Sequence, residues 1–210
     1  NYKQEKFILS KIFRKYDLSI NLTASDRSVV YALAASSKSI SAIEMDNKKS
    51  WWKKMFLYKY YFFDFDDHIL INNLKSLNSL NIKYDKKIIA PIISSKIKED
   101  MLTLLNKKGI NKFIIFHPSA QYKYKVYSEE LRNKLLSLLS KIGVPIIITG
   151  GVNEIDNEIK KSLRTIPNVH DFIGKTTLEE YVVLSELSLG YVGMDTLNMH
   201  IAASQNKRIF

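Results

Sequence analysis

The most constraining feature of the sequence is a regular alternation of apolar runs and helical patterns between residues 112 and 210. The predicted strands are 112–118, 144–151, 169–174, 188–194 and 207–210, and the helices between them are 128–143, 153–166, 177–187 and 195–205. Strands that alternate with helices in this way form parallel sheets. The second half of the chain is therefore expected to be an α/β domain.

The first half of the chain shows the same two patterns less regularly. Helices are predicted over 5–16, 26–36, 66–77 and 94–109, and strands over 17–22 and 86–93. A boundary inside the 94–111 segment divides the chain into an N-terminal domain, 1–100, and a C-terminal domain, 101–210. The chain starts on a helix and stops inside a predicted strand, whereas a doubly wound domain usually begins with a strand. Both ends are therefore expected to be incomplete.

The composition excludes several classes of protein. Hydrophobic residues make up 46% and charged residues 25%, as in globular proteins, and the absence of cysteine excludes disulfides. No apolar run reaches the roughly 18 residues that a membrane-spanning helix needs. The net charge of +11 favours polyanionic partners such as nucleic acid, anionic lipid or phosphorylated substrates. A proteome rich in Lys and Ile explains the charge equally well.

Three segments follow predicted strands and precede predicted helices. They are "HPSAQYKYK" (117–125), "TGGVNE" (149–154) and "GMDT" (193–196). In open α/β sheets, ligands bind beyond the carboxyl ends of the strands. Small residues allow a ligand to approach the backbone, and the free N–H groups of the next helix favour an anion. These segments therefore predict a site for a phosphate-bearing ligand.

The individual polar residues of these segments each have two interpretations. Spacing alone favours Asp195 as a helix N-cap over a ligand contact, and a lone His200 fits a core histidine. Lys125 can place a positive charge on a phosphate, but it is also consistent with a solvated lysine beside Lys123. Glu154 suits either the dipole of its helix or a ribose hydroxyl. No His/Asp cluster has metal-ligand spacing, so neither a metal nor a cofactor is expected.

The stretch "KKSWWKKMFLYKYYFF" (48–63) interleaves aromatic residues with lysines. This mixture is typical of a membrane interface or an anionic glycolipid site, and also of single-stranded nucleic-acid binding. An amphipathic helix that packs its aromatic residues into the core is as well supported as these two together. The following "DFDD" (64–67) fits a solvated helix start better than paired acids or a metal site.

Taken together, the motifs resemble those of a known family. "HPSA" followed by Lys125-Val-Tyr-Ser, "IIITGGVNE", and "FIGKTTLEEYVVLSELSLGYVGMDTLNMHIAAS" are similar, in order and spacing, to the C-terminal half of glycosyltransferase family nine, the ADP-heptose:lipopolysaccharide heptosyltransferases. That family shows His-Pro-Gly-Ala, Lys-x-Trp-Pro, Gly-Gly, Gly-Lys-Thr-Ser-Leu and Asp-Thr-Gly-Pro-Met-His elements. "KYDLSINLTASDRSVVYALAAS" resembles a segment of the family's N-terminal half more weakly.

The resemblance implies a GT-B fold, in which two Rossmann-like domains with parallel sheets face a cleft and the C-terminal one holds the nucleotide sugar. By resemblance, Ser119 and Ala120 contact the diphosphate, Lys125 a phosphate, Glu154 the ribose and Thr176 the nucleoside. Asp195, Thr196 and Leu197 surround the diphosphate and sugar, with His200 in the same block. The family has Gly and Pro where this chain has Leu197 and Asn198, which puts the sugar contacts in question.

The implied activity is an inverting, metal-independent transfer of heptose from ADP-heptose to an inner-core sugar of lipopolysaccharide. The family's general base lies in an N-terminal segment that this sequence does not contain, so no catalytic residue is assigned. Lys48, Lys49, Lys53 and Lys54 are the candidates to meet the anionic glycolipid acceptor. The implied location is cytoplasmic, with peripheral contact at the inner membrane. The alternatives are a transferase for another nucleotide sugar, a non-catalytic donor-binding protein, and, less favoured, a basic nucleic-acid-binding protein.

Overall fold

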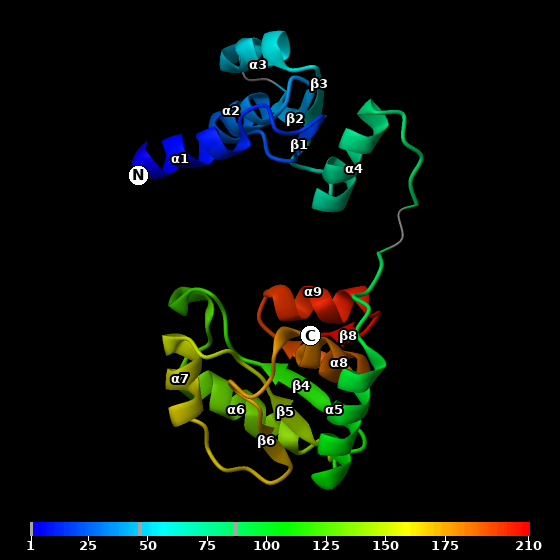
Figure 1. Cartoon of the computed structure of the whole chain (residues 1–210). Coiled ribbons are helices and arrows are strands. Elements are labelled where there is room, and N and C mark those ends of the chain that lie inside the picture. The colour runs from blue at the N-terminus through cyan, green and yellow to red at the C-terminus, as the bar shows by residue number, and fades with distance from the viewer. Residues whose placement is uncertain (1, 46–47, 86–87) are drawn as a thin grey trace. The chain divides into compact units, whose positions relative to one another are not determined.

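The computed structural model describes residues 2–45, 48–85 and 88–210. The chain divides into two compact units, Asn1–Lys86 and Lys87–Phe210, each of which is described by itself (Figure 1). The units divide between residues 86 and 87, N-terminal to the boundary expected between residues 100 and 101. That boundary falls inside α5 (Ser95–Lys107), whose buried Met101 and Leu105 belong to the core of the second unit.

Unit 1 contains a three-stranded parallel sheet with helices around it. The strands are β1 (Ser19–Asn21), β2 (Ser39–Glu44) and β3 (Lys59–Phe63), in the order β1-β2-β3. The helices are α1 (Tyr2–Ile12), α2 (Asp26–Ala35), the 3-10 turn η1 (Lys48–Ser50), α3 (Trp51–Phe56) and α4 (Ile69–Ser79). Small apolar clusters form around Val29, Ile43 and Leu57 and around Ile40, Ala42 and Tyr61.

Several predictions for the first half of the chain are wrong. The 48–63 stretch is not one amphipathic helix, since it divides into η1, α3 and β3. Its aromatic residues are not all in the core: Tyr61 is buried, but Trp51 and Phe56 are more than 60% exposed. The strand predicted over 86–93 is absent from residues 88–93, which pair with no neighbouring strand and of which Ile92 is 93% exposed. Residues 86 and 87 lie outside the described residues.

Unit 2 has the alternating architecture that the sequence predicts. Five parallel strands, β4 (Ile114–His117), β5 (Ile146–Ile148), β6 (Val169–Asp171), β7 (Gly190–Gly193) and β8 (Arg208–Ile209), lie in the order β6-β5-β4-β7-β8. Between them come η2 (Lys123–Lys125), α6 (Glu129–Ser140), α7 (Glu154–Lys161), α8 (Leu178–Leu187) and α9 (Leu197–Ser204). The α/β class with parallel sheets is thus confirmed.

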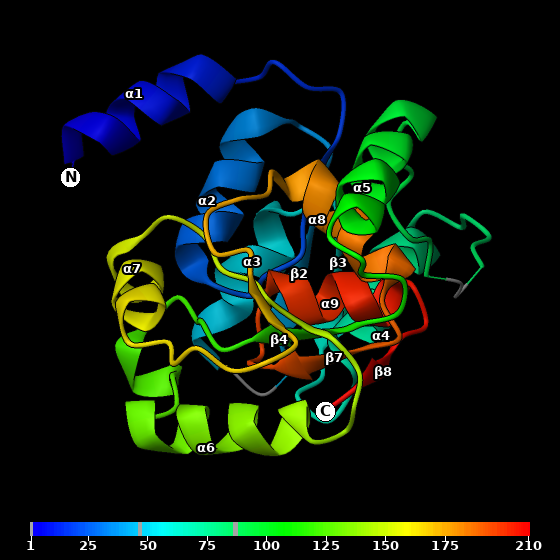
Figure 2. The ribbon, with the colours of Figure 1, turned by 90° about the horizontal axis from the view of Figure 1, so that it is seen from below.

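The helices of unit 2 cover both faces of its sheet (Figure 2). On one face, α5, α8 and α9 pack on Ile115, Ile147 and Tyr191. On the other face, Leu136 of α6 and Ile159 of α7 pack on Phe116, Ile146 and Ile148 of the strands. Because successive side chains of a strand point to opposite faces, strands buried on both sides are apolar throughout, as "FIIF" and "PIII" are.

Candidate functional site

The strand order of unit 2 reverses direction at β4. The chain leaves β4 toward β5 and β6 on one side, and then crosses back through α8 to β7 on the other side of β4. The loops after β4 and β7 therefore diverge from adjacent strands, and the N–H of Met194 donates to the carbonyl of His117 at 3.2 Å. In open α/β sheets this switch point is where ligands bind.

A cavity of about 350 Å³ opens at this point, called here the strand-end cavity. Loops after β4, β5 and β7 line it, together with η2 and the start of α9. Its lining residues are His117, Ser119, Ala120, Gln121, Tyr122, Lys125, Gly151, Asn153, Asp156, Asp195, Thr196 and Leu197. The three segments singled out in the sequence thus contribute to one cavity.

Six of the nine residues that the sequence analysis assigns to the donor lie in this lining: Ser119, Ala120, Lys125, Asp195, Thr196 and Leu197. Glu154, Thr176 and His200 are not part of it. Glu154 starts α7 beside the lining residue Asn153, and Thr176 is half-buried before α8. His200 is exposed, and its Nε2 lies 3.6 Å from the carboxylate of Asp195.

The groups of this cavity that can attract an anion are Lys125 and the start of α9, and they share the lining with the carboxylates of Asp156 and Asp195. Lys125 is exposed, and among the described residues no carboxylate lies within ion-pair distance of its Nζ. Thr196 is the N-cap of α9 but makes no side-chain capping bond, so the first N–H groups of the helix remain open to a ligand. An ammonium and a helix N-terminus in one cavity can hold an anion.

The expected capping role of Asp195 is wrong. The N-cap of α9 is Thr196, one residue later than expected. The backbone of Thr196 is still extended, with φ −143°, and the helix begins only at Leu197. Asp195 is exposed next to the cavity and faces His200 instead. Its carboxylate is therefore available to a ligand hydroxyl rather than engaged in capping the start of the helix.

Asp156 is a buried polar residue of the cavity lining that the sequence did not single out. Asp156 is only 2% exposed, and no described residue donates to its Oδ1. A Cβ added to Gly150 would lie 2.7 Å from that oxygen, and one added to Gly151 would lie 3.0 Å from Oδ2. The Gly-Gly pair thus makes room for this carboxylate, a reason that the sequence alone did not provide.

His117, which lines the cavity, links the ends of β4 and β5 to helix α9. Its Nδ1 lies 3.0 Å from Thr149 Oγ1 and 3.0 Å from Asn198 Nδ2. An amide nitrogen only donates, so Nδ1 accepts and the neutral ring carries its proton on Nε2. Asn198, noted in the sequence only as a departure from the family pattern, therefore ties α9 to β4.

We expect His117 to make stability depend on pH. Burial lowers its pKa from 6.5 to about 4, against the opposing effects of Asp156 and Thr149. The unfolded chain takes up this proton near pH 6.5 and the folded chain only near pH 4. The free energy of unfolding is therefore highest above pH 6.5 and falls toward pH 4, by up to about 3 kcal/mol. Denaturant titrations over this range measure the loss.

His117→Asn is the control variant, because its amide oxygen keeps an acceptor near Nδ1 but does not titrate. The pH slope of this variant should be flatter than that of the wild type. His170, whose pKa burial and Lys108 also lower, contributes equally to both proteins. Identical slopes for the two proteins would contradict the assignment to His117.

The described residues contain no group of three or more His, Cys, Asp or Glu side chains placed to hold a metal ion. None of the helices formed by them combines the length and the apolar composition needed to cross a bilayer.

Comparison with known proteins gives consistent matches. The model of glycosyltransferase family 9 (heptosyltransferase) matches residues 9–210. Lipopolysaccharide heptosyltransferase 3 of Escherichia coli is 25% identical over 210 residues, which cover 95% of this chain and 60% of that protein.

Solved structures of the same family have a similar fold. The family 9 glycosyltransferase of Veillonella parvula has a TM-score of 0.71 at 17% identity, over 99% of this chain and 59% of its own. E. coli heptosyltransferase WaaC with ADP-2-deoxy-2-fluoro heptose has a TM-score of 0.69 at 17% identity, over 99% and 65%. The chain thus spans less than two thirds of these relatives, and it shares their fold.

Proposed function

The chain belongs to glycosyltransferase family 9, and we propose on that basis that its strand-end cavity binds the nucleotide-activated sugar of a glycosyl transfer. The observation that carries the proposal is the meeting of Lys125 with the open N-terminus of α9 at the switch point of the sheet. These two groups suit a diphosphate, because each supplies donors to an anion. Ser119 and Ala120, both buried in the loop after β4, line the same cavity.

The proposed donor is ADP-heptose and the proposed acceptor an inner-core sugar of lipopolysaccharide. The acceptor hydroxyl oxygen bonds to the anomeric carbon from the face opposite the diphosphate, the bond to the diphosphate oxygen breaks, and ADP leaves. Lys125 and the N–H groups of α9 stabilise the charge that develops on the leaving diphosphate. The hydroxyl proton passes to a general base, for which we assign no residue.

Calorimetric titration with ADP, UDP and GDP, followed by ADP-heptose, tests this proposal. We expect ADP to bind more tightly than the other two nucleotides, and ADP-heptose to bind through the same residues. A preference for UDP or GDP would overturn the choice of nucleotide. Absence of binding by all three would remove the strand-end cavity as a donor site.

A second candidate is transfer of a different sugar from a nucleotide. Leu197 is 59% exposed and lines the cavity at the position where the family resemblance expects glycine. A leucine side chain occupies space that glycine leaves to a ligand. Tight binding of ADP together with rejection of ADP-heptose in the same titration would favour this alternative over the heptose donor. Binding of ADP-heptose without transfer would favour a non-catalytic protein.

We further propose that unit 1 makes peripheral contact with an anionic membrane surface. Helix α3 exposes Trp51, Met55 and Phe56, each by more than 60%. Lys48 is exposed, and the Nζ of Lys54 lies 5.3 Å from the ring centre of Phe62. Exposed apolar side chains next to lysines are typical of surfaces that lie at the headgroup level.

Two of the four lysines expected to meet the acceptor do not support this contact. Lys53 is 1% exposed, pairs with Asp26 at 2.7 Å and donates to the carbonyl of Ala24. It therefore stabilises the packing of α3 on α2 and does not reach solvent. The side chain of Lys49 lies outside the described residues.

Sedimentation with phosphatidylglycerol vesicles measures this contact. We expect binding that weakens with added salt and falls several-fold in Trp51→Ala, whereas phosphatidylcholine vesicles bind little. Phe13→Ala removes an aromatic ring that is equally exposed, at 63%, but lies outside α3, and should leave binding unchanged. Equal losses in the two variants would contradict a contact through α3.

A further inference from the structure

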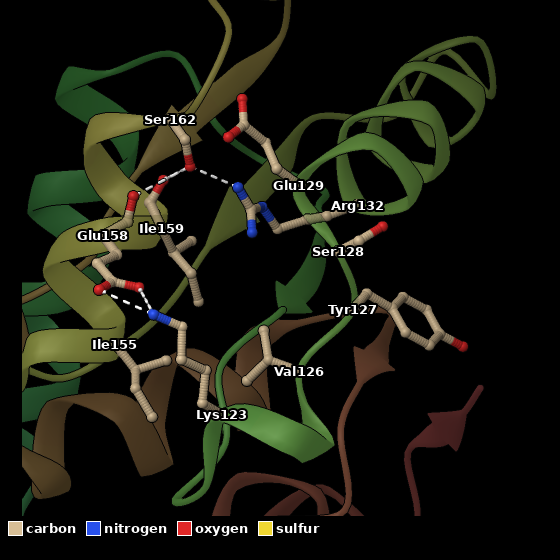
Figure 3. Close-up of a pocket in the computed structure, with 10 residues that line it drawn as sticks. All are labelled: Lys123, Val126, Tyr127, Ser128, Glu129, Arg132, Ile155, Glu158, Ile159 and Ser162. Carbon is tan, nitrogen blue, oxygen red and sulfur yellow. Dashed lines mark hydrogen bonds and ion pairs between the residues drawn. The ribbon is translucent and has the colours of Figure 1, made fainter.

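We propose that unit 2 holds a second ligand site, a cavity between α6 and α7 in which the buried guanidinium of Arg132 binds a small monocarboxylic acid with an apolar body. This α6–α7 cavity has a volume of about 300 Å³ (Figure 3). It shares no lining residue with the strand-end cavity. The turn η2 contributes Lys125 to the strand-end cavity and Lys123 to the α6–α7 cavity.

Arg132 is the group that points to an anion. The residue is only 4% exposed, and its Nη2 donates to the hydroxyl of Ser162 at the end of α7. Its Nε is buried without a hydrogen-bond partner, and no carboxylate of the described residues pairs with it. Burial lowers the pKa of Arg132, yet a guanidinium stays charged at any physiological pH. The carboxylate of Glu129 acts on Arg132 only from beyond ion-pair distance. A buried cation with no anion in direct contact is costly, so an anionic ligand would be bound favourably.

The side chains around the guanidinium set the shape of the ligand. In Figure 3, Arg132 extends from α6 toward α7, and Ile159 and Val126 lie below its guanidinium. Ile155 continues this apolar wall. A carboxylate on the arginine would place a short carbon body against these side chains. The volume lies at the lower end of small-molecule sites, which fits an acid of that size.

The charges around the cavity favour a single negative charge. Lys123 is already paired with Glu158, with Nζ 2.9 Å from Oε2. Glu129 adds a second carboxylate to the lining. The lining has two cations and two anions, and therefore no net charge. Both glutamates would repel a dianionic phosphate more strongly than a ligand with a single negative charge. The planar fork of Arg132 matches a carboxylate, which can accept two parallel N–H bonds.

NMR of the full chain tests the proposal through the Nε–Hε resonance of Arg132, with benzoate, acetate and inorganic phosphate as probes. Arginine occurs at few positions, which keeps this region of the spectrum simple: Arg14, Arg27, Arg132, Arg164 and Arg208. We expect benzoate to shift the Arg132 resonance and to bind at least about tenfold more tightly than acetate, because it also buries apolar surface. Phosphate should bind more weakly than benzoate.

Two variants complete the test. Arg132→Met, which keeps most of the side-chain volume, should reduce benzoate affinity at least about tenfold. Arg164→Met removes an exposed arginine outside the cavity and should leave the affinity unchanged. An Arg132 resonance in the wild type that does not respond to benzoate would overturn the proposal, whatever the stability of the variant. Phosphate binding equal to that of benzoate would overturn the choice of ligand class.

Discussion

Gly193→Ala is expected to destabilise unit 2 by about 3 kcal/mol, at the upper end of the cost of overpacking. A Cβ at this position would lie 2.4 Å from the carbonyl oxygen of His117 and 3.0 Å from the hydroxyl of Tyr191. The first of these atoms belongs to the backbone of the neighbouring strand and cannot rotate away. β4 and β7 must therefore separate where Gly193 pairs with His117, which disrupts the strand-end cavity.

Hydrogen exchange of the amides of β4 and β7 measures this loss within unit 2 alone. Gly143→Ala is the matched control, because its Cβ would meet no heavy atom within 4 Å. Its backbone has φ +79°, so alanine there costs about 1 kcal/mol through the left-handed conformation alone. Equal losses of protection in the two variants would show that the contact with His117 is not the cause.

Lys125→Ala is expected to weaken ADP binding roughly tenfold to hundredfold, the usual value of a charge-assisted hydrogen bond to phosphate. The side chain lies on η2, lines the strand-end cavity and has no ion-pair partner among the described residues. Its removal should therefore act on the ligand and leave the fold intact. The calorimetric titration with ADP measures the change in affinity, and thermal unfolding without ligand checks stability.

Lys123→Ala supplies the control on the same turn. Lys123 is also exposed, but it pairs with Glu158 and lines the other cavity. Lys123→Ala removes the same charge two residues before Lys125. It should change ADP affinity less than threefold, because solvent and salt screen a surface charge that does not contact the ligand. Similar effects of both substitutions would mean that net charge, rather than contact by Lys125, governs binding.

The second half of the fold was predictable because its local patterns agree with each other. The buried strands are apolar throughout, and helices such as α6 begin at a serine and are followed by Gly143. The first half lacks this agreement. β2 was missed because Ser39 and Ser41 interrupt its apolar run. The structure buries both serines, and their hydroxyls bond to main-chain carbonyls.

The site was predictable at the level of loops but not of every contact. The carboxyl ends of parallel strands meet at one edge, so the three turns were correctly expected to converge. Asp156 and Asn198 were missed for a different reason. Asn198 acts through His117, which is far away in the sequence, whereas Asp156 faces a nearby Gly-Gly turn whose need for small residues shows only once the loop is folded. Such contacts depend on tertiary packing, which spacing along a single chain does not contain.

The irregular segment 88–92 has a consequence for how such a protein can diversify. It lies outside the hydrophobic clusters of both units, and everything that lines the two cavities is encoded after it. Recombination of genes at these codons would transfer the five strands of unit 2 together without splitting a core. New N-terminal sequences could thus be joined to an inherited strand-end cavity in one genetic event.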